Sequence, residues 1–217
     1  MDAGAPTKGF ALTTKRLRPL ITVTAVTIAA ALPSTASAGL VVADASNCAS
    51  TVSAQVFQPF ADPAYYTLQP GGDFEPSSPD WDLTGGAGLA SGNEPWNLTG
   101  RQADNHSLAL GSGSSATSGT MCVGLDNPTI RFFTRASSSL ATLKVEVLFF
   151  DANGAQQSAQ IGLVKGSSAW APTAQIPIVA NLLPLLPDGR TPVAFRLTAT
   201  GGNWAVDDFY VDPMQRW

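Results

Sequence analysis

Leu143-Lys-Val-Glu-Val-Leu-Phe-Phe150 is the stretch that decides the fold. Apolar residues occupy every second position from Leu143 to Phe149, and charged side chains alternate with them in the first half. This period of two is typical of a β-strand with one buried face. The run Asp151-Ala-Asn-Gly154 follows. It can form a turn, because its glycine accepts a positive φ. Residues 155–164 can then return as a hairpin partner, with Ile161 and Leu163 on one face.

Other runs of β-branched and aromatic residues are spread along the chain. The longer ones cover residues 129–135, 193–199 and 204–211, and the shorter ones cover 52–57, 81–84, 107–110 and 121–124. Gly/Ser/Pro-rich segments separate them, and we expect residues 85–92 and 111–119 to be loops. No amphipathic run predicts a confident helix, and no repeat of 20–50 residues is visible. Many short strands separated by turn residues predict a single all-β domain, an antiparallel β-sandwich or barrel.

The composition excludes several classes of function. The 217 residues carry a net charge of −4 with a pI near 4.8, whereas a nucleic-acid-binding protein needs a basic face. One histidine, His106, and two cysteines cannot supply the three or four ligands of a Cys/His zinc site. Acid/base chemistry would therefore depend on carboxylates, tyrosine or lysine. The chain also lacks a Gly-x-Ser-x-Gly nucleophile motif and a glycine-rich phosphate loop.

The first 38 residues have the three parts of a secretory signal peptide. Four basic side chains precede an apolar stretch of 13 residues, Leu20–Leu32, and small residues stand at Ala36 and Ala38. The alternative is a membrane anchor, but 13 helical residues span about 20 Å and the hydrocarbon core needs about 30 Å. We expect cleavage after Ala38 and a secreted product. Residues 39–217 then carry a net charge of −7.

Both cysteines, Cys48 and Cys122, follow the predicted cleavage point. An even pair in an oxidising compartment predicts one disulfide. It would close a loop of about 75 residues, worth about 4–5 kcal/mol in the chain-entropy treatment. The alternative is two buried free thiols.

Two separated segments carry a resemblance to a known family. Residues 70–86, Pro-Gly-Gly-Asp-Phe-Glu-Pro-Ser-Ser-Pro-Asp-Trp-Asp-Leu-Thr-Gly-Gly, and residues 204–211, Trp-Ala-Val-Asp-Asp-Phe-Tyr-Val, resemble the opening and closing strands of β-jelly-roll carbohydrate-binding modules of the galactose-binding-domain-like group. The likeness implies a jelly-roll domain at 70–217, preceded by an arm or extra strand at 39–69. The chain as a whole also resembles uncharacterised secreted proteins of actinobacteria.

The resemblance implies a structural calcium ion shared by the opening Phe-Glu and the closing aspartates. The matching positions are Glu75 and Asp207 or Asp208, with Asp73 as a nearby donor. Calcium prefers six to eight hard oxygen ligands, and carboxylates distant in sequence can meet where terminal strands pair. The alternative is that these acids are solvated. Strand alternation places Asp207 and Asp208 on opposite faces unless a bulge intervenes.

Sugar binding in such modules uses aromatic faces together with polar side chains. Trp81 and Trp204 lie in the motifs that match the fold, and we expect them in the core. Trp96 and Trp170 lie in polar or proline-rich stretches and are the candidate contact residues. The candidate polar partners beside Trp96 are Asn93, Glu94 and Asn97.

We therefore expect a secreted, non-catalytic binding domain for carbohydrate or another extracellular ligand, with a polysaccharide or cell-surface glycan as partner. No nucleic acid and no membrane insertion after signal cleavage are expected, and the domain should be a monomer. Two alternatives remain open. One is a structural or interaction protein of the cell exterior without a sugar site, and the other is a hydrolase that uses a carboxylate pair.

Overall fold

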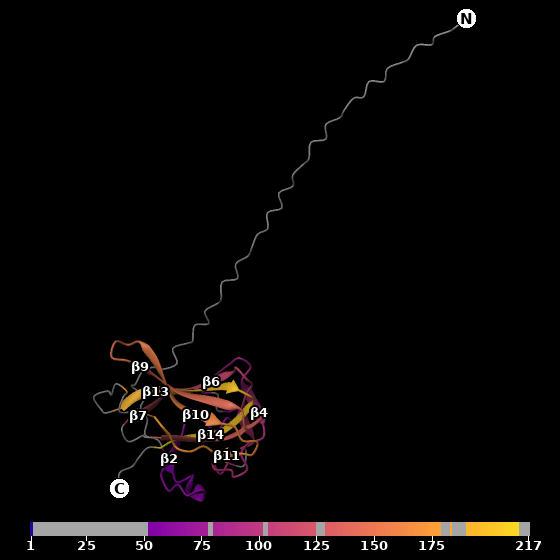
Figure 1. The fold of residues 1–217 in the computed structure, drawn as a ribbon. Coiled ribbons are helices and arrows are strands. Elements are labelled where there is room, and N and C mark those ends of the chain that lie inside the picture. The colour runs from indigo at the N-terminus through magenta and orange to yellow at the C-terminus, as the bar shows by residue number, and fades with distance from the viewer. Residues whose placement is uncertain are drawn as a thin grey trace. The chain divides into compact units, whose positions relative to one another are not determined.

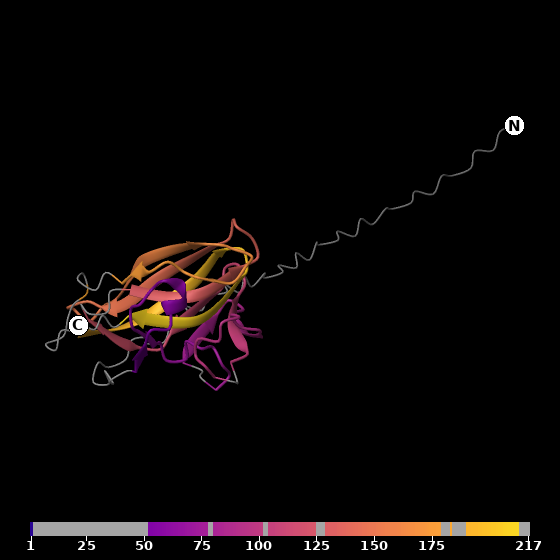
Figure 2. The same ribbon diagram turned by 90° about the horizontal axis from the view of Figure 1, so that it is seen from below.

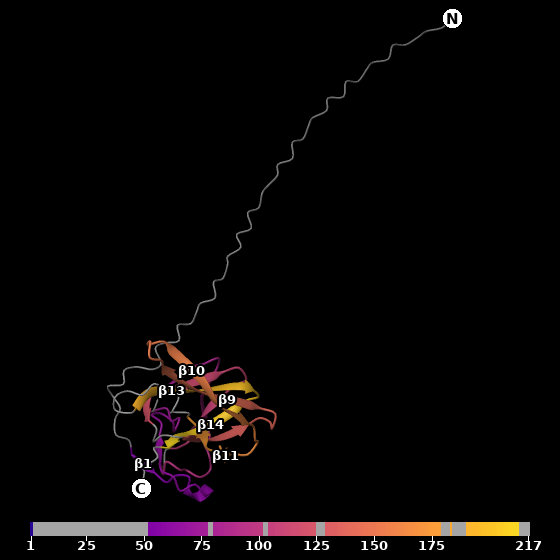
Figure 3. The same cartoon turned by 60° about the vertical axis from the view of Figure 1, so that its left-hand side comes forward.

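Two antiparallel sheets packed face to face form the domain (Figures 1 and 3). The computed structural model describes residues 1, 52–77, 80–101, 104–124, 129–178, 183 and 190–212. The predicted all-β antiparallel sandwich is confirmed. The signal peptide lies outside the described residues. Among the residues that are described, no helix is long and apolar enough to cross a membrane.

Sheet B contains the hairpin predicted from residues 143–164. Its order is β10-β9-β13-β6-β3, and β7 pairs with the first part of β13. Its strands are β3 (Trp81–Thr84), β6 (Ser115–Ser118), β7 (Met121–Gly124), β9 (Thr142–Phe150), β10 (Gln156–Lys165) and β13 (Arg190–Gly201). In β9, Leu143, Val145 and Val147 are fully buried in the core between the sheets. The period of two therefore predicted this strand correctly.

Sheet A is organised around the last strand, β14 (Trp204–Asp212). Its path is β1-β2-β14-β5-β4, and β8 pairs with β14, β11 and β12. The other strands are β1 (Ser53–Ala54), β2 (Tyr66–Leu68), β4 (Gly88–Ser91), β5 (His106–Leu110), β8 (Thr129–Ala136), β11 (Ala171–Pro172) and β12 (Ile176–Pro177). β8 runs along one side of β14, while β5 and β2 share the other side. Strand β14 is thus held from both sides.

A bulge in β10 changes the predicted faces of this strand. The register with β9 shifts between Gln160 and Gly162. Ile161 packs against the core, whereas Leu163 is 54% exposed, so the expectation that both share a face is wrong. Ile161 is the extra residue of the bulge, and a Cβ on the following Gly162 would lie 3.0 Å from the side chain of Ile176, so little space is left there.

Two segments expected to be loops contain strands. β4 lies within residues 85–92, and β6 lies within 111–119, between β13 and β3. In β6 only Ala116 reaches the main core, so its apolar pattern is too weak to predict a strand. Conversely, only Ser53–Ala54 of the expected strand 52–57 is extended, and a short 3-10 helix, η2 (Gln58–Phe60), follows.

The core between the sheets is rich in aromatic rings. Phe132 and Phe209 stack with centroids 5.1 Å apart, and Trp81 packs edge-on against Phe209. Trp81 and Trp204 are both buried in this core, as predicted.

A second cluster covers the outer face of sheet A. We call Phe57, Tyr66, Phe133 and Tyr210 the outer aromatic cluster. Residues 52–66, which precede most of the sandwich, supply two of its rings and are drawn in indigo over β14 in Figure 2. The segment predicted as an arm or extra strand therefore contributes β1, η2 and β2 where it is described.

Cys122 lies in β7 and is not a free thiol. Its predicted partner, Cys48, lies outside the described residues. The Cys48–Cys122 pairing therefore stays a prediction.

Candidate functional site

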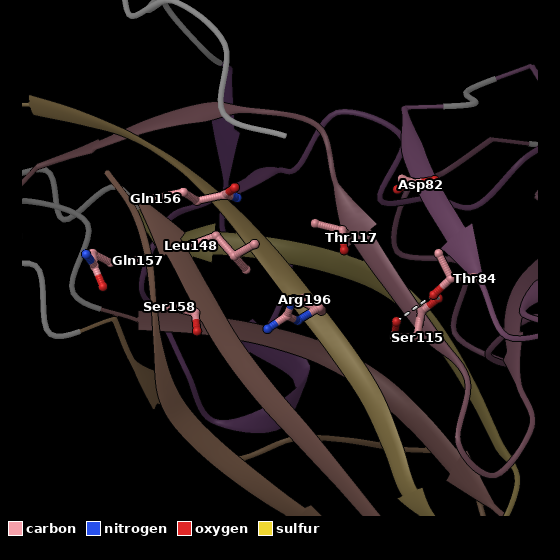
Figure 4. A pocket seen from close by; sticks show the side chains of 9 residues that line it. All are labelled: Asp82, Thr84, Ser115, Thr117, Leu148, Gln156, Gln157, Ser158 and Arg196. Atoms are coloured by element: carbon pink, nitrogen blue, oxygen red, sulfur yellow. Dashed lines mark hydrogen bonds between the residues drawn. The ribbon is translucent and has the colours of Figure 1, made fainter. Parts of the chain in front are cut away.

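The outer face of sheet B is hollowed (Figure 4). The hollow has a volume of about 340 Å³. It is lined by Asp82, Thr84, Ser115, Thr117, Leu148, Gln156, Gln157, Ser158 and Arg196. These residues come from β3, β6, β9, β10 and β13, so the hollow crosses every strand on the path of the sheet.

Strand alternation explains why this face is polar. In β3, Trp81 packs in the core while Asp82 points outward, and in β6 the outward neighbours of Ala116 are Ser115 and Thr117. A small apolar patch of Leu148, Ala194 and Phe150 lies on the same face. The hollow thus combines many hydroxyl and amide groups with a limited apolar surface.

The single cation among the lining residues is tied to a carboxylate. Arg196 Nε lies 2.9 Å from Glu146, and Lys144 Nζ lies 3.1 Å from the same side chain. Burial alone would raise the pKa of Glu146, but the hydrogen bonds from Arg196 and Lys144 outweigh it and hold the pKa below its usual value. Glu146 therefore stays ionised and orients Arg196. Figure 4 shows Arg196 between Ser158 on one side and Thr117 and Ser115 on the other.

The second notable region is a cluster of buried acids at the middle of β14. The register with β8 shifts between Asp207 and Tyr210, and Asp208 has a left-handed backbone with φ of 52°. This bulge is the exception that strand alternation allowed for, and it leaves both Asp207 and Asp208 with 0% exposure. Burial raises the pKa of Asp207 to about 8, and burial together with Asp207 raises the pKa of Asp208 to about 9.

Three carboxylates, two from the β4–β5 loop and one from β14, meet at this point. Glu94, Asp104 and Asp208 each place an oxygen atom within 4.8 Å of the others. Neither carboxylate oxygen of Asp208 has a hydrogen-bond partner, and Asp104 Oδ1 also has none. A cation would satisfy these buried oxygens, and carboxylates are the ligands that calcium prefers. We call Glu94, Asp104 and Asp208 the acid triplet.

The four predicted metal ligands are only partly in this group. Asp208 belongs to it, while Asp207 accepts the backbone N–H of Glu94 and of Asp208. Asp73 pairs with Arg101 through Oδ2, and its Oδ1 is buried without a partner.

Glu75, the fourth of these predicted ligands, accepts hydrogen bonds from protein groups, and its role as a metal ligand stays a prediction. It accepts the N–H groups of Asn105 and His106 at 2.6 and 2.7 Å and lies 2.9 Å from His106 Nδ1. These contacts hold the pKa of Glu75 below its usual value, against the opposing effect of burial. Asp104 was missed because nothing in Asp104-Asn-His-Ser107 indicates that the fold brings it to Asp208.

The predicted sugar-contact residues lie on sheet A, away from the hollow. Trp96 is 43% exposed and packs against Phe60 and Phe133, with centroids 5.1 and 5.2 Å apart. Trp170 is half-buried beside the outer aromatic cluster, and Arg135 lies 5.3 Å from its ring centroid.

The predicted polar partners of Trp96 lie in the loop between β4 and β5. Asn93 Nδ2 donates to the carbonyl of Asp104 at 3.0 Å, and Asn97 has a left-handed backbone with φ of 49°. The Glu94 side chain is buried, and its carboxylate faces inward to backbone N–H groups. The predicted contact residues thus include Glu94 of the acid triplet, but none of them lines the hollow. The alternation of polar and apolar residues at Asp82–Thr84 and Ser115–Thr117 was the available signal.

No protein-family description matches this chain, and no curated protein matches it significantly. Among solved structures, the chain is similar to the CBM22-1 xylan-binding domain from Paenibacillus barcinonensis, with 16% identity, a TM-score of 0.45, and coverage of 67% of this chain and 93% of that one. It is also similar to the CBM22-1–GH10 modules of a Clostridium thermocellum endo-1,4-β-D-xylanase complexed with xylohexaose, with 13% identity and a TM-score of 0.45.

That match covers 63% of this chain but only 26% of the xylanase chain. A third similarity, to a CBM61 domain in complex with β-1,4-galactotriose, has 18% identity, a TM-score of 0.31, and coverage of 65% and 91%. At these values the ligands of those proteins do not transfer to this chain. Its own residues have to support a function.

Proposed function

We propose that this chain is a secreted, non-catalytic module that binds a polysaccharide or cell-surface glycan in the hollow of sheet B. The observation that supports this most is an open, hollowed sheet face lined by hydroxyl, amide and charged side chains. Sugars present many hydroxyl groups, and such side chains can donate to and accept from them. Leu148 also lines the hollow but is only 4% exposed, so the polar side chains would make most of the contacts with a sugar.

The shape of the hollow favours a stretch of chain over a single sugar. Its lining residues come from all five strands of the path β10-β9-β13-β6-β3. Neighbouring strands lie about 4.8 Å apart, so the row is about 19 Å wide. A linear oligosaccharide lying across the strands would contact Gln156 and Ser158 at one end and Thr117, Ser115 and Thr84 at the other.

A retention experiment tests this function. The purified protein is run by affinity electrophoresis through gels containing neutral or acidic polysaccharides, and we expect at least one of them to slow it. Gln156→Ala should weaken the retention, because Gln156 lines the hollow. Gln160→Ala is the matched control, since Gln160 is exposed on the same strand but outside the hollow. No retention on any polysaccharide would reject the function, and equal retention of both variants would reject the site.

A structural calcium ion is the second part of the proposal. The buried oxygens of Asp208 and Asp104 that lack hydrogen-bond partners support it, and Glu94 completes the acid triplet. Such an ion would neutralise two carboxylates of the β4–β5 loop, Glu94 and Asp104, and one of β14, Asp208. We expect a chelator to lower the melting temperature and added calcium to restore it. An unchanged melting curve would contradict this part alone.

A further inference from the structure

We propose that Glu94 couples cation binding at the acid triplet to the position of Trp96. The inference rests on the proposed calcium ion and concerns the loop of residues 92–99, which we call the Trp96 loop. Its ligand is a divalent cation, and Glu94 acts as a positioning residue. Trp96 is the side chain whose exposure reports the state of the loop.

The Trp96 loop is built around the carboxylate of Glu94. One oxygen of Glu94 accepts the N–H of Trp96, and the other accepts the N–H of Leu98 at 3.0 Å. The N–H of Glu94 itself donates to Asp207 Oδ2 at 3.0 Å. The Glu94 carboxylate therefore has two roles: it accepts hydrogen bonds from the backbone of the loop, and it lies within reach of Asp104 and Asp208.

Of the three residues of the acid triplet, Glu94 is the one that is free to move. Asp208 is fixed in β14, which is paired with β8 on one side and with β5 and β2 on the other. Asp104 is held by the chain that follows it, because the N–H groups of Asn105 and His106 donate to Glu75. Glu94 lies on a surface loop. A cation would attract the Glu94 carboxylate towards Asp104 and Asp208. Without a cation this attraction is absent, so Glu94 can move outward, and its two N–H partners move with it.

The contacts of Trp96 make such a movement visible. Its ring packs on Phe60 and Phe133 and is 43% exposed. If Glu94 moves outward, the N–H of Trp96 loses its hydrogen-bond acceptor, and the Trp96 ring loses its packing contacts with these two phenylalanines. Cation binding should therefore decrease the solvent exposure of Trp96.

Acrylamide quenching of tryptophan fluorescence tests this coupling, with and without calcium. The Trp96 contribution is the difference between the wild-type protein and Trp96→Phe. We expect calcium to lower the quenching constant of this contribution, and titration calorimetry on the same samples measures calcium binding directly. Calcium binding that leaves Trp96 quenching unchanged would overturn the coupling and leave the calcium proposal standing. An absence of calcium binding would overturn both.

Two variants separate the role of Glu94 from a general loss of structure. Asp104→Asn removes a triplet carboxylate without touching the N–H groups of Trp96 and Leu98, so quenching should stay at its calcium-free level when calcium is added. Glu94→Gln should also abolish the response and should increase quenching even without calcium. Asp151→Asn, an acid in the β9–β10 turn, is the control and should respond like the wild type. A normal calcium response in both triplet variants would reject the inference.

Discussion

The two outer faces of the sandwich differ in what covers them. The outer face of sheet A is covered by residues 52–66, which complete the outer aromatic cluster. On the outer face of sheet B, the described residues form a polar hollow beside a small buried apolar cluster of Leu148, Ala194 and Phe150. One face has thus become a second core, and the other is left available for a ligand.

The same difference separates two arginines. Arg131, on the covered face, pairs with Asp62 at 2.6 Å, and its side chain is 10% exposed. Arg196, on the open face, pairs with Glu146, and its side chain is 33% exposed. Arg131 also donates to the carbonyl of Thr173 and lies over the ring of Phe57. Arg131 therefore stabilises the fold, while Arg196 is exposed enough to contact a ligand.

Replacing the two arginines gives the largest expected contrast. Arg131→Met leaves Asp62 buried with an unpaired charge, and removal of one partner of such a pair costs about 3–5 kcal/mol. Arg196→Met breaks a partly exposed pair while Glu146 keeps Lys144, so we expect a loss of about 0–1 kcal/mol. Urea denaturation of both variants measures this. Equal losses would show that the two faces contribute alike.

A smaller effect is expected where a loop backbone packs directly on β14. A Cβ on Gly72 would lie 2.7 Å from the carbonyl oxygen of Phe209, and the N–H of Phe209 donates to the carbonyl of Gly72. Gly72→Ala should therefore cost about 1–3 kcal/mol through overpacking. Gly88→Ala, in the edge strand β4, adds a methyl group to open space and is the control. Similar melting temperatures for the two variants would disprove the close approach.

The covered face should also give the protein a pH dependence. Burial raises the pKa of Asp212 to about 6, despite the hydroxyl of Thr129 at 3.4 Å. The folded state then keeps a proton that the unfolded state releases near pH 4, so stability falls as the pH rises from about 4 to about 6. Asp212→Asn should be more stable than the wild type at pH 7, by on the order of 1 kcal/mol, and similar to it below pH 4. Denaturation midpoints across this range provide the measurement, and a constant difference at every pH would contradict the assignment.

The smallest effect on stability is expected in the hollow itself. Ser158→Ala removes an exposed hydroxyl, so stability should change by no more than about 0.5 kcal/mol. If the hydroxyl bonds a sugar, glycan binding should weaken by about 0.5–1.5 kcal/mol. Retention in affinity gels measures the effect on glycan binding, and the melting temperature measures the effect on stability. A variant that loses stability but keeps its retention would place Ser158 in the structural part of the molecule.

The strands with a strong apolar period could be predicted from the sequence, and those with a weak one could not. β9 and β13 place alternating large side chains in the core, so their pattern is explicit. β6 contributes only Ala116 to that core and is extended because β13 and β3 pair with it. Its strand conformation depends on neighbours distant in sequence, which no local pattern reports.

The two candidate sites were predictable to different degrees. The acids Asp207 and Asp208 stood out, and the bulge that buries both was recognised as a possibility. Their meeting with Asp104 and Glu94 depends on how the β4–β5 loop folds against β14. The hollow depends on side chains from five strands, each of which looks like an ordinary solvent-facing position on its own. Site geometry of that kind arises only when the strands are assembled.

The bulge at Ile161 has a further consequence for how copies of this protein meet. Strand β10 is an edge strand of ten residues. The unpaired backbone N–H and C=O groups of such an edge can pair with a strand of another chain. The bulge interrupts the regular spacing of backbone donors and acceptors along β10. The exposed Lys165 adds a positive charge at the end of the strand. A second copy would therefore find no flat edge to extend. Concentrated solutions should resist fibril formation for this reason, and restoring a regular β10 should make the protein prone to aggregation.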